Sequence, residues 1–190
     1  MELLKKKILE EGYCIGDSIL KVDSFLNAQV DIELMNEIGK EFKSLFKDAI
    51  VTKILTAEAS GIAIAAITAQ YFNCPIIIAK KYLSVNMDVE NYEAQVYSFT
   101  KKKEYVMRVS KKHLTKEDNV LIIDDFLANG LASMGLINMV ELSGANLVGI
   151  GIVVEKTFQE GRKLLEDKNI RIESLARIKS LKSGNIEFLE

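Results

Sequence analysis

The chain has 190 residues, 48% of them hydrophobic, and a formal net charge of −2. This length suits one domain with a substantial core, and the slightly acidic balance argues against a nucleic-acid-binding protein, which would be strongly basic. No apolar run is long enough to cross a membrane, the first residues resemble neither a signal nor a transit peptide, and Cys14 and Cys74 lack metal-site spacing. We therefore expect a cytoplasmic protein with reduced cysteines and with no nucleic-acid or membrane partner.

The N-terminal part of the chain predicts two helices. Apolar residues recur at helical spacing within the first eleven residues and again after Asp31, which is a suitable N-cap. In the second segment the recurring residues are Met35, Ile38, Phe42, Leu45 and Phe46.

Strands and helices alternate after this point. The predicted strands are 53–56, 76–79, 120–124 and 147–154, and the predicted helices are 61–72 and 130–142. The single proline, Pro75, precedes a strand, where a missing N–H group is tolerated. Such alternation indicates βαβ units and a parallel sheet with right-handed crossovers.

Residues 82–112 break this pattern. Segment 83–93 is polar, and segments 94–100 and 104–109 alternate as two strands would, with a run of three lysines at 101–103 as their turn. A long insertion beside a site is more often a functional lid than a structureless loop, so we expect a lid here. Residues 170–189 carry two further strand-like runs, which we expect to join the N-terminal portion in a small cap over the sheet.

An acid pair stands at the carboxyl end of the predicted strand 120–124. Asp124 and Asp125 are followed by a short turn, and Gly130 opens the next helix. In open α/β sheets ligands bind outside the carboxyl ends of strands, and a helix N-terminus offers N–H groups to an anion. Both acids can reach one ligand only if the strand ends there, since adjacent strand residues point to opposite faces. The pattern favours a ligand with hydroxyl groups beside a phosphate, such as ribose 5-phosphate; the alternative is a pair of solvated acids that cap the helix.

A second strand-to-helix loop, Glu58-Ala59-Ser60-Gly61, offers the same anion-binding geometry. The alternative is an ordinary turn with Ser60 as a helix N-cap. Lys80 and Lys81 close the next strand and could neutralise a bound anion, or could simply be solvated.

Residues 124–132, Asp-Asp-Phe-Leu-Ala-Asn-Gly-Leu-Ala, resemble the phosphoribosyl diphosphate (PRPP) signature of the type I phosphoribosyltransferases. Four further segments resemble the xanthine phosphoribosyltransferase family in the expected order, and together they span nearly the whole chain. These segments are 20–27, 58–62, 96–100 and 154–156 with Phe158.

One departure from the broader superfamily concerns the phosphate loop. That loop usually carries Thr-Thr-Gly-x-Thr, whereas this chain has Ala128, Asn129, Gly130, Leu131 and Ala132. Side-chain hydroxyls that normally help to hold the 5′-phosphate are missing, so backbone N–H groups and Asn129 must contribute more. The xanthine-specific family resembles this chain in that feature.

The resemblance implies an α/β fold, a doubly wound parallel sheet with a small hood formed by the N- and C-terminal segments. The chain would be a single domain, 1–190, with a core at about 40–156 and a hood at about 1–39 and 157–190. It would transfer the 5-phosphoribosyl group of PRPP to N9 of xanthine, giving XMP and pyrophosphate in purine salvage. Mg²⁺ would arrive with PRPP and have few or no direct protein ligands, and the protein would be a homodimer.

The resemblance also assigns site residues by their positions in this sequence. Asp124 and Asp125 would be catalytic, stabilising the oxocarbenium-like sugar. PRPP would be bound by 128–132 and, around its pyrophosphate, by Ala59, Ser60, Gly61 and Lys81. Xanthine would be bound by Leu20, Asn27, Lys156 and Phe158.

Two of these roles compete with simpler interpretations. Lys156 would donate to O6 of the purine, but a lysine at a strand end is usually a surface residue. Phe158 could stack on the purine or pack in the core. His113, the only histidine, lies among polar residues and is interpreted as a surface residue.

Two other functions remain open. A hypoxanthine or guanine phosphoribosyltransferase would share the PRPP residues and differ in the base pocket. A purine-sensing regulator would bind PRPP without catalysis. Such a regulator normally carries a separate DNA-binding domain, for which this chain has no room, and the acidic pI of about 5.7 also argues against it.

Overall fold

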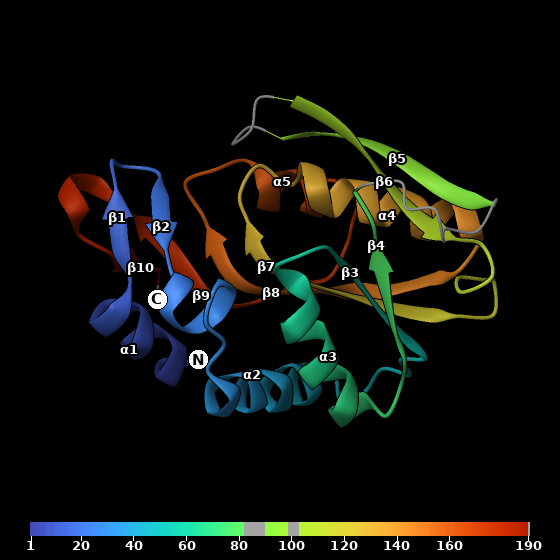
Figure 1. Ribbon diagram of the computed structural model, residues 1–190, viewed down its shortest axis with the longest axis horizontal. Coiled ribbons are helices and arrows are strands. Elements are labelled where there is room, and N and C mark those ends of the chain that lie inside the picture. The colour runs from blue at the N-terminus through green and yellow to red at the C-terminus, as the bar shows by residue number, and fades with distance from the viewer. Residues whose placement is uncertain (82–89, 99–102, 190) are drawn as a thin grey trace.

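The computed structural model describes residues 1–81, 90–98 and 103–189, and its centre is a six-stranded sheet (Figure 1). The strand order is β10-β9-β8-β7-β3-β4, and all neighbouring pairs are parallel except β10 with β9. The strands are β3 (Lys53–Ala57), β4 (Ile76–Ala79), β7 (Asn119–Leu127), β8 (Asn146–Lys156), β9 (Ile172–Ser180) and β10 (Glu187–Phe188). The expected α/β fold with a mostly parallel sheet is confirmed.

Layers of other elements cover both faces of the sheet (Figure 1). One face carries α1 (Glu2–Glu11), α2 (Ile32–Leu45) and α3 (Gly61–Phe72). The other carries α4 (Leu131–Ser143), α5 (Gly161–Glu166) and the hairpin of β5 (Asn91–Ser98) and β6 (Lys103–Ser110). Side chains of β7 alternate between the layers: Leu121 and Ile123 enter the first core cluster, and Val120 and Ile122 enter the second.

The helix boundaries follow local chemistry. The side chain of Asp31 accepts a hydrogen bond from Leu34 N at 3.1 Å, which confirms it as the N-cap of α2. Helix α4 begins after Gly130 and ends before Gly144, and both glycines have left-handed backbone angles, with φ of +82° and +74°. Helix α3 and strand β4 have the predicted bounds.

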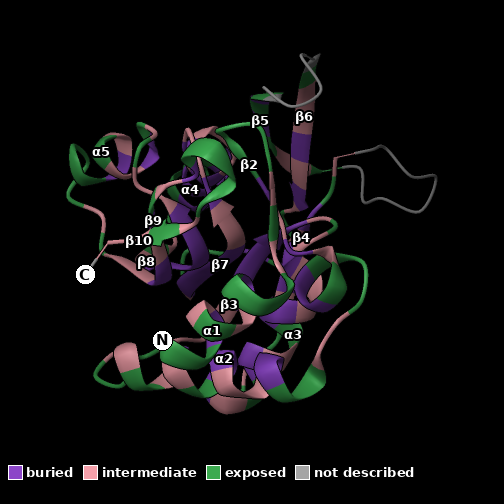
Figure 2. Cartoon of the chain, turned by 90° about the vertical axis from the view of Figure 1, so that its left-hand side faces the viewer, coloured by how far each residue is buried: buried purple, intermediate pink, exposed green. Residues whose placement is uncertain are grey.

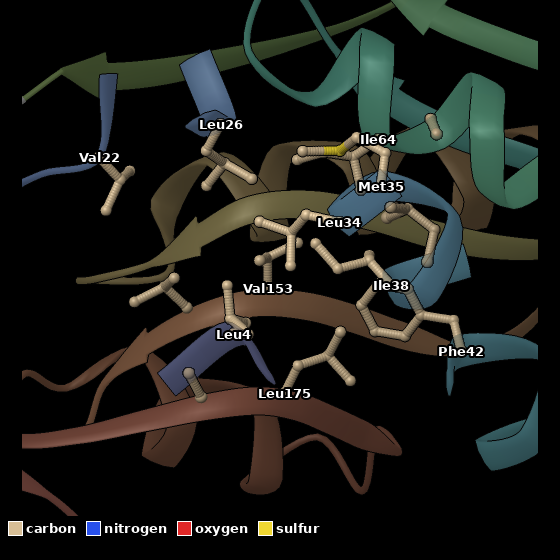
Figure 3. Close-up of a cluster of buried hydrophobic side chains, with 14 of the residues drawn as sticks. Leu4, Val22, Leu26, Leu34, Met35, Ile38, Phe42, Ile64, Val153 and Leu175 are labelled. Atoms are coloured by element: carbon tan, nitrogen blue, oxygen red, sulfur yellow. The ribbon is translucent and has the colours of Figure 1, made fainter. Parts of the chain in front are cut away.

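The N-terminal part of the hood is a hairpin of β1 (Tyr13–Ile15) and β2 (Ile19–Lys21), followed by a π-helical turn η1 (Asp23–Asn27). Figure 3 shows that Leu4, Val22 and Leu26 from this region lie in one hydrophobic cluster with Val153 and Leu175 of the sheet. In Figure 2 the buried residues lie on the central strands and recur along the helices that pack against them. The hood therefore shares its core with the sheet.

The C-terminal segment differs from the expected hood. Strand β9 pairs in parallel with β8 from Ile150↔Ile172 to Lys156↔Ile178, so it belongs to the main sheet. Short η2 (Lys182–Gly184) and β10 follow it. The proposed core and hood boundaries stay a prediction.

The expected hairpin within 82–112 is present as β5 and β6, which pair from Asn91↔Ser110 to Ser98↔Lys103. Residues 82–89 and 99–102 of the expected lid lie outside the described residues, among them the first two lysines of the 101–103 run. Within the described part of the chain, no helix is both long and apolar enough to span a membrane.

Candidate active site

The carboxyl ends of four parallel strands bring the acid pair, the residues expected to bind PRPP and Lys156 to one edge of the sheet. Ala57 of β3 pairs with Ala79 of β4, and Leu127 of β7 pairs with Glu155 of β8. The loops that follow these strands therefore leave the sheet side by side, as the ligand-binding loops of open α/β sheets do.

The acid pair lies within β7, not at its end. This strand continues to Leu127 because it still pairs with β8, so the predicted end at residue 124 is wrong. Its pairing with β3, however, stops at Ile122, which opens the other side of β7 beside Asp124. Asp124 is 6% exposed and Asp125 is half-buried. Neither acid caps α4, whose N-cap is Gly130 without a side-chain bond among the described residues, so the capping alternative is wrong.

The two carboxyl groups have different electrostatic surroundings. Burial raises the pKa of Asp124 well above its usual value, and the negative charge of Asp125 adds to this effect, while Lys81 opposes it. Lys81 Nζ lies 5.3 Å from the ring centroid of Tyr105, whose pKa is raised by burial and then by Asp124. Asp125 instead interacts with Lys156. The acid pair thus lies between two cationic side chains, with Lys81 near Asp124 and Lys156 near Asp125.

The turn at 128–132 presents backbone groups at the N-terminus of α4. Asn129 Oδ1 accepts a hydrogen bond from Leu131 N at 3.1 Å, and Gly130 supplies the left-handed conformation that the turn requires. The Asn129 oxygen therefore holds the turn itself. Anion binding by the five residues Ala128, Asn129, Gly130, Leu131 and Ala132 stays a prediction.

The loop between β3 and α3 lies against the acid pair. A Cβ atom on Gly61 would be 2.1 Å from Thr56 Oγ1 and 3.2 Å from Asp124 Oδ1, so only glycine permits this approach of the helix N-terminus. Glu58 Oε1 accepts a hydrogen bond from Lys81 N at 2.5 Å, which ties the loop to the second residue after β4. Ser60 occupies the N-cap position of α3, as the alternative interpretation had it, but its side chain makes no capping hydrogen bond within the described residues. Anion binding by Ala59, Ser60 and Gly61 stays a prediction.

The loop after β4 holds its two lysines differently. Lys80 exchanges backbone hydrogen bonds of 2.9 Å with Arg108 of β6, and its side chain is exposed. Lys81 is half-buried beside Tyr105 and Asp124. Of the two, Lys81 is the one that faces the acid pair.

Lys156 ends β8 as a half-buried residue beneath the hood. Its Nζ donates a hydrogen bond to Ser18 O at 2.8 Å and lies 5.4 Å from the Phe126 ring centroid. Burial lowers the pKa of Lys156, and Asp125 and Cys14 act in the opposite direction. The surface alternative for this lysine is therefore wrong.

The other predicted base contacts are spread over the hood. Leu20 is 5% exposed and pairs with Cys14, whereas Asn27 ends η1 with an exposed side chain. Phe158 is 41% exposed, so the core-packing alternative is wrong. It lines a cavity of about 480 Å³ together with Asp17, Lys179, Ser180, Leu181, Lys182 and Glu187. Contacts of a base with Leu20, Asn27 and Phe158 stay a prediction.

No family model matches the chain, but curated relatives do. It is 58% identical over 188 residues to a xanthine phosphoribosyltransferase from Clostridium novyi (strain NT), with 99% of each chain covered. It is also 58% identical over 190 residues to one from Ruminiclostridium cellulolyticum, with 100% of each covered. The chain belongs to the xanthine phosphoribosyltransferase family. The resemblance found in the sequence is thereby confirmed.

Solved structures show the fold of this xanthine phosphoribosyltransferase family member. An adenine phosphoribosyltransferase from Rhodothermus marinus has a TM-score of 0.74 at 17% identity, over 94% of this chain and 100% of that one. One from Saccharomyces cerevisiae has a TM-score of 0.74 at 19% identity, over 92% and 99%. Such identities support the type I phosphoribosyltransferase fold and nothing further.

Sequence reasoning missed three groups beside the site of this family member. Thr56 Oγ1 is buried and has no hydrogen-bond partner among the described residues, and Tyr105 reaches Lys81 from the β5–β6 hairpin. Arg162 of α5 forms an ion pair with buried Glu155. The surroundings of Thr56 and Tyr105 depend on how elements distant in sequence pack, and the Arg162–Glu155 pair depends on how α5 packs against β8. No local pattern therefore marked them. The glycine at Gly161, directly before Arg162, was the one available signal.

Proposed function

We propose that this protein transfers the 5-phosphoribosyl group of PRPP to N9 of xanthine, producing XMP and pyrophosphate in purine salvage. The observation that carries the proposal is the acid pair between two strand-to-helix loops, with Lys156 beside Asp125. Relatives at 53–58% identity over essentially the whole chain are named for this activity.

The acid pair would act on the sugar. Transfer from PRPP develops positive charge on the ribose ring, and a fixed carboxylate nearby stabilises it without reorganisation. Asp124 interacts with Lys81 and lies against the N-terminus of α3, whereas Asp125 interacts with Lys156. This separation supports a reaction in which pyrophosphate leaves on the side of Asp124 and the base approaches on the side of Asp125.

Backbone groups would hold the phosphates. The 5′-phosphate would bind at 128–132, where the turn before α4 offers N–H groups and a helix dipole. Pyrophosphate would bind at Ala59, Ser60 and Gly61 before α3, with its charge balanced by Lys81. Both assignments rest on the shared sheet edge of these loops.

The base would be read from the hood side. Lys156 would donate to O6, a group that xanthine, guanine and hypoxanthine have in common. Phe158 would stack on the ring, since it is exposed and two residues beyond Lys156. Discrimination at C2 and N3 would come from Asn27 and the segment around Leu20.

Mg²⁺ would enter as part of the substrate, bound to the oxygens of PRPP. The described residues contain no group of three or more acidic, histidine or cysteine side chains that could hold a metal ion. Asp124 and Asp125 have the oxygen donors that Mg²⁺ prefers, so they could meet a substrate-bound ion through water.

A homodimer in the cytoplasm completes the proposal. Helix α3 has no charged residue, and its exposed Ala66 and Gln70 line an open depression of about 510 Å³ beside the edge strand β4. This uncharged face suits a second copy of the chain. Cys14 and Cys74 are free thiols, as is usual in a reducing compartment.

A steady-state assay with PRPP, Mg²⁺ and four bases tests the activity. We expect the highest catalytic efficiency with xanthine, lower values with guanine and hypoxanthine, and the lowest with adenine, which has no O6. Preference for hypoxanthine or guanine would identify the related salvage enzyme. Calorimetric PRPP binding without turnover of any base would indicate a regulator.

A further inference from the structure

A buried carboxylate stands between the two substrate regions and has no part in the proposed chemistry. Glu155 of β8 is 1% exposed, directly before Lys156 and paired with Leu127, the last residue of β7. Arg162 donates to both of its oxygens, with Nε to Oε1 at 2.6 Å and Nη2 to Oε2 at 2.7 Å. Such a bidentate pair fixes the direction as well as the distance of the guanidinium group.

The rest of the arginine is equally constrained. Its Nη1 donates to Glu166 at 3.1 Å and its Nη2 to Ser174 Oγ of β9 at 3.3 Å. Burial alone would raise the pKa of Glu155, but Arg162, Ser174 and Arg177 together lower it below its usual value. The carboxyl group is thus held as a carboxylate, and Arg162 links α5 to both β8 and β9.

The residue before this arginine touches the phosphate turn. Gly161 N donates a hydrogen bond to Ala128 O at 3.0 Å, and a Cβ atom on Gly161 would be only 2.4 Å from that oxygen and 2.9 Å from Gly130 N. A Cβ on Gly130 would in turn be 3.0 Å from Gly161 Cα. The two glycines therefore let the start of α5 lie directly against the turn at 128–132 (Figure 1).

We propose that Arg162 and Glu155 form a brace that fixes the turn 128–132 for the 5′-phosphate of PRPP, which makes Arg162 a positioning residue. The brace rests on the proposed function, because it presumes that this turn receives the phosphate. Arg162 directly follows Gly161 in the chain, and Gly161 N donates a hydrogen bond to the carbonyl of Ala128, the first residue of the turn. Any displacement of the guanidinium group is therefore passed to the turn through a very short stretch of chain.

The brace acts on one substrate region more than on the other. Lys156 follows Glu155, but its Nζ is held separately by Ser18 O and lies near Asp125. Arg177 Nε, at 3.4 Å from Glu155 Oε2, makes no hydrogen bond with any described residue and cannot replace the bidentate pair. Loss of Arg162 should therefore loosen the turn while Lys156 keeps its anchor.

The test compares Arg162→Met with Arg162→Lys and with the matched control Arg171→Met. Arg171 also forms an ion pair, with Glu173 at 3.0 Å, but at the amino end of β9, away from the site. For Arg162→Met we expect the KM for PRPP to rise about tenfold or more, with the KM for xanthine within about twofold of wild type. Arg162→Lys should recover part of the loss, and Arg171→Met should leave both constants unchanged.

Gly161→Ala gives a second approach to the same turn without removing a charge. It should weaken PRPP affinity, because the added methyl group must displace the Ala128 carbonyl. Calorimetric titration with Mg²⁺ and PRPP measures the PRPP affinity directly. It therefore tests the brace even if xanthine is not the base. If wild type bound PRPP but did not turn over xanthine, the proposed function would fail and the brace would still be tested.

Two outcomes would overturn the brace. One is unchanged PRPP affinity in the folded Arg162→Met and Gly161→Ala proteins. The other is an equal rise of both KM values in Arg162→Met with no recovery in Arg162→Lys, which is the signature of general destabilisation. A rise in the KM for PRPP alone in Arg162→Met, with partial recovery in Arg162→Lys, would support the brace.

Discussion

The two proposed substrate regions of this molecule are built in different ways. The proposed PRPP region consists of short loops that continue directly from core strands, so PRPP binding there would rely on backbone N–H groups and on glycines that allow close approach. The base region instead collects side chains from separate elements, as the hydrogen bond between Lys156 and Ser18, 138 residues apart, illustrates. Backbone recognition survives most side-chain changes, whereas side-chain recognition can be altered one residue at a time. Base specificity can therefore change while PRPP binding is kept.

The largest expected effect comes from the acid pair, which serves both regions. Asp125→Asn should lower turnover about 10²- to 10³-fold with every base, because it removes a fixed negative charge beside the sugar. Asp124→Asn should lower turnover less. Single-turnover rates with several bases, together with thermal melting, check this. Wild-type rates in both folded variants would remove the pair from the mechanism.

A smaller, one-sided effect is expected at Lys156. Lys156→Ala should reduce the catalytic efficiency about ten- to a hundredfold with xanthine, guanine and hypoxanthine alike, since a charged hydrogen bond to their common O6 is lost. The KM for PRPP should change little. If the efficiency ratio between bases moved instead, Lys156 would read C2 and not O6.

Substitution of Asn27 should change the preference among purine bases without changing PRPP binding. Asn27→Ala should change the xanthine-to-hypoxanthine efficiency ratio about tenfold, the cost of one hydrogen bond of 1–2 kcal/mol at C2. Because the side chain of Asn27 is exposed, the substitution should leave the fold intact. A ratio equal to wild type would assign discrimination to the segment around Leu20.

The smallest effect concerns stability and pH. Burial raises the pKa of Asp124 in the folded protein above its value in the unfolded chain. As pH rises between these two pKa values, the unfolded chain has lost the proton while the folded protein still holds it. The free energy of unfolding therefore falls as pH rises through this range. Asp124→Asn removes that penalty and should raise the free energy of unfolding at pH 7–8 by about 1 kcal/mol, or 2–4 °C in melting temperature. The difference should vanish near pH 3, where both states are protonated. Denaturation curves at several pH values would show the opposite trend if Asp124 were stabilising as a carboxylate.

Local patterns predicted most of the fold and the positions of the two strand-to-helix loops. Helix α3 and strand β4 have the bounds that apolar periodicity and Pro75 indicated, and the strand-to-helix loops lie where their glycines suggested. The end of β7 was missed because pairing with β8 extends it past the acids, a long-range effect. The same is true of β9, which joins the sheet through β8.

The base region and the brace were less accessible to sequence reasoning. Lys156 and Phe158 were assigned through family resemblance, and only the structure separates buried from exposed alternatives for them. The partnership of Glu155 with Arg162 depends on where α5 packs, which no spacing rule specifies. Physical prediction was therefore strongest where one short segment contains all the necessary groups.

The hydrophobic cluster shared by hood and sheet has a consequence for engineering. Because Leu4, Val22 and Leu26 pack with Val153 and Leu175, the hood has no core of its own and should unfold with the sheet in one cooperative transition (Figure 3). A chimera that exchanges only the hairpin and η1 for those of a relative would leave mismatched apolar surfaces on β8 and β9. Transplanting a purine pocket therefore requires moving α1 and its sheet-facing partners as one unit.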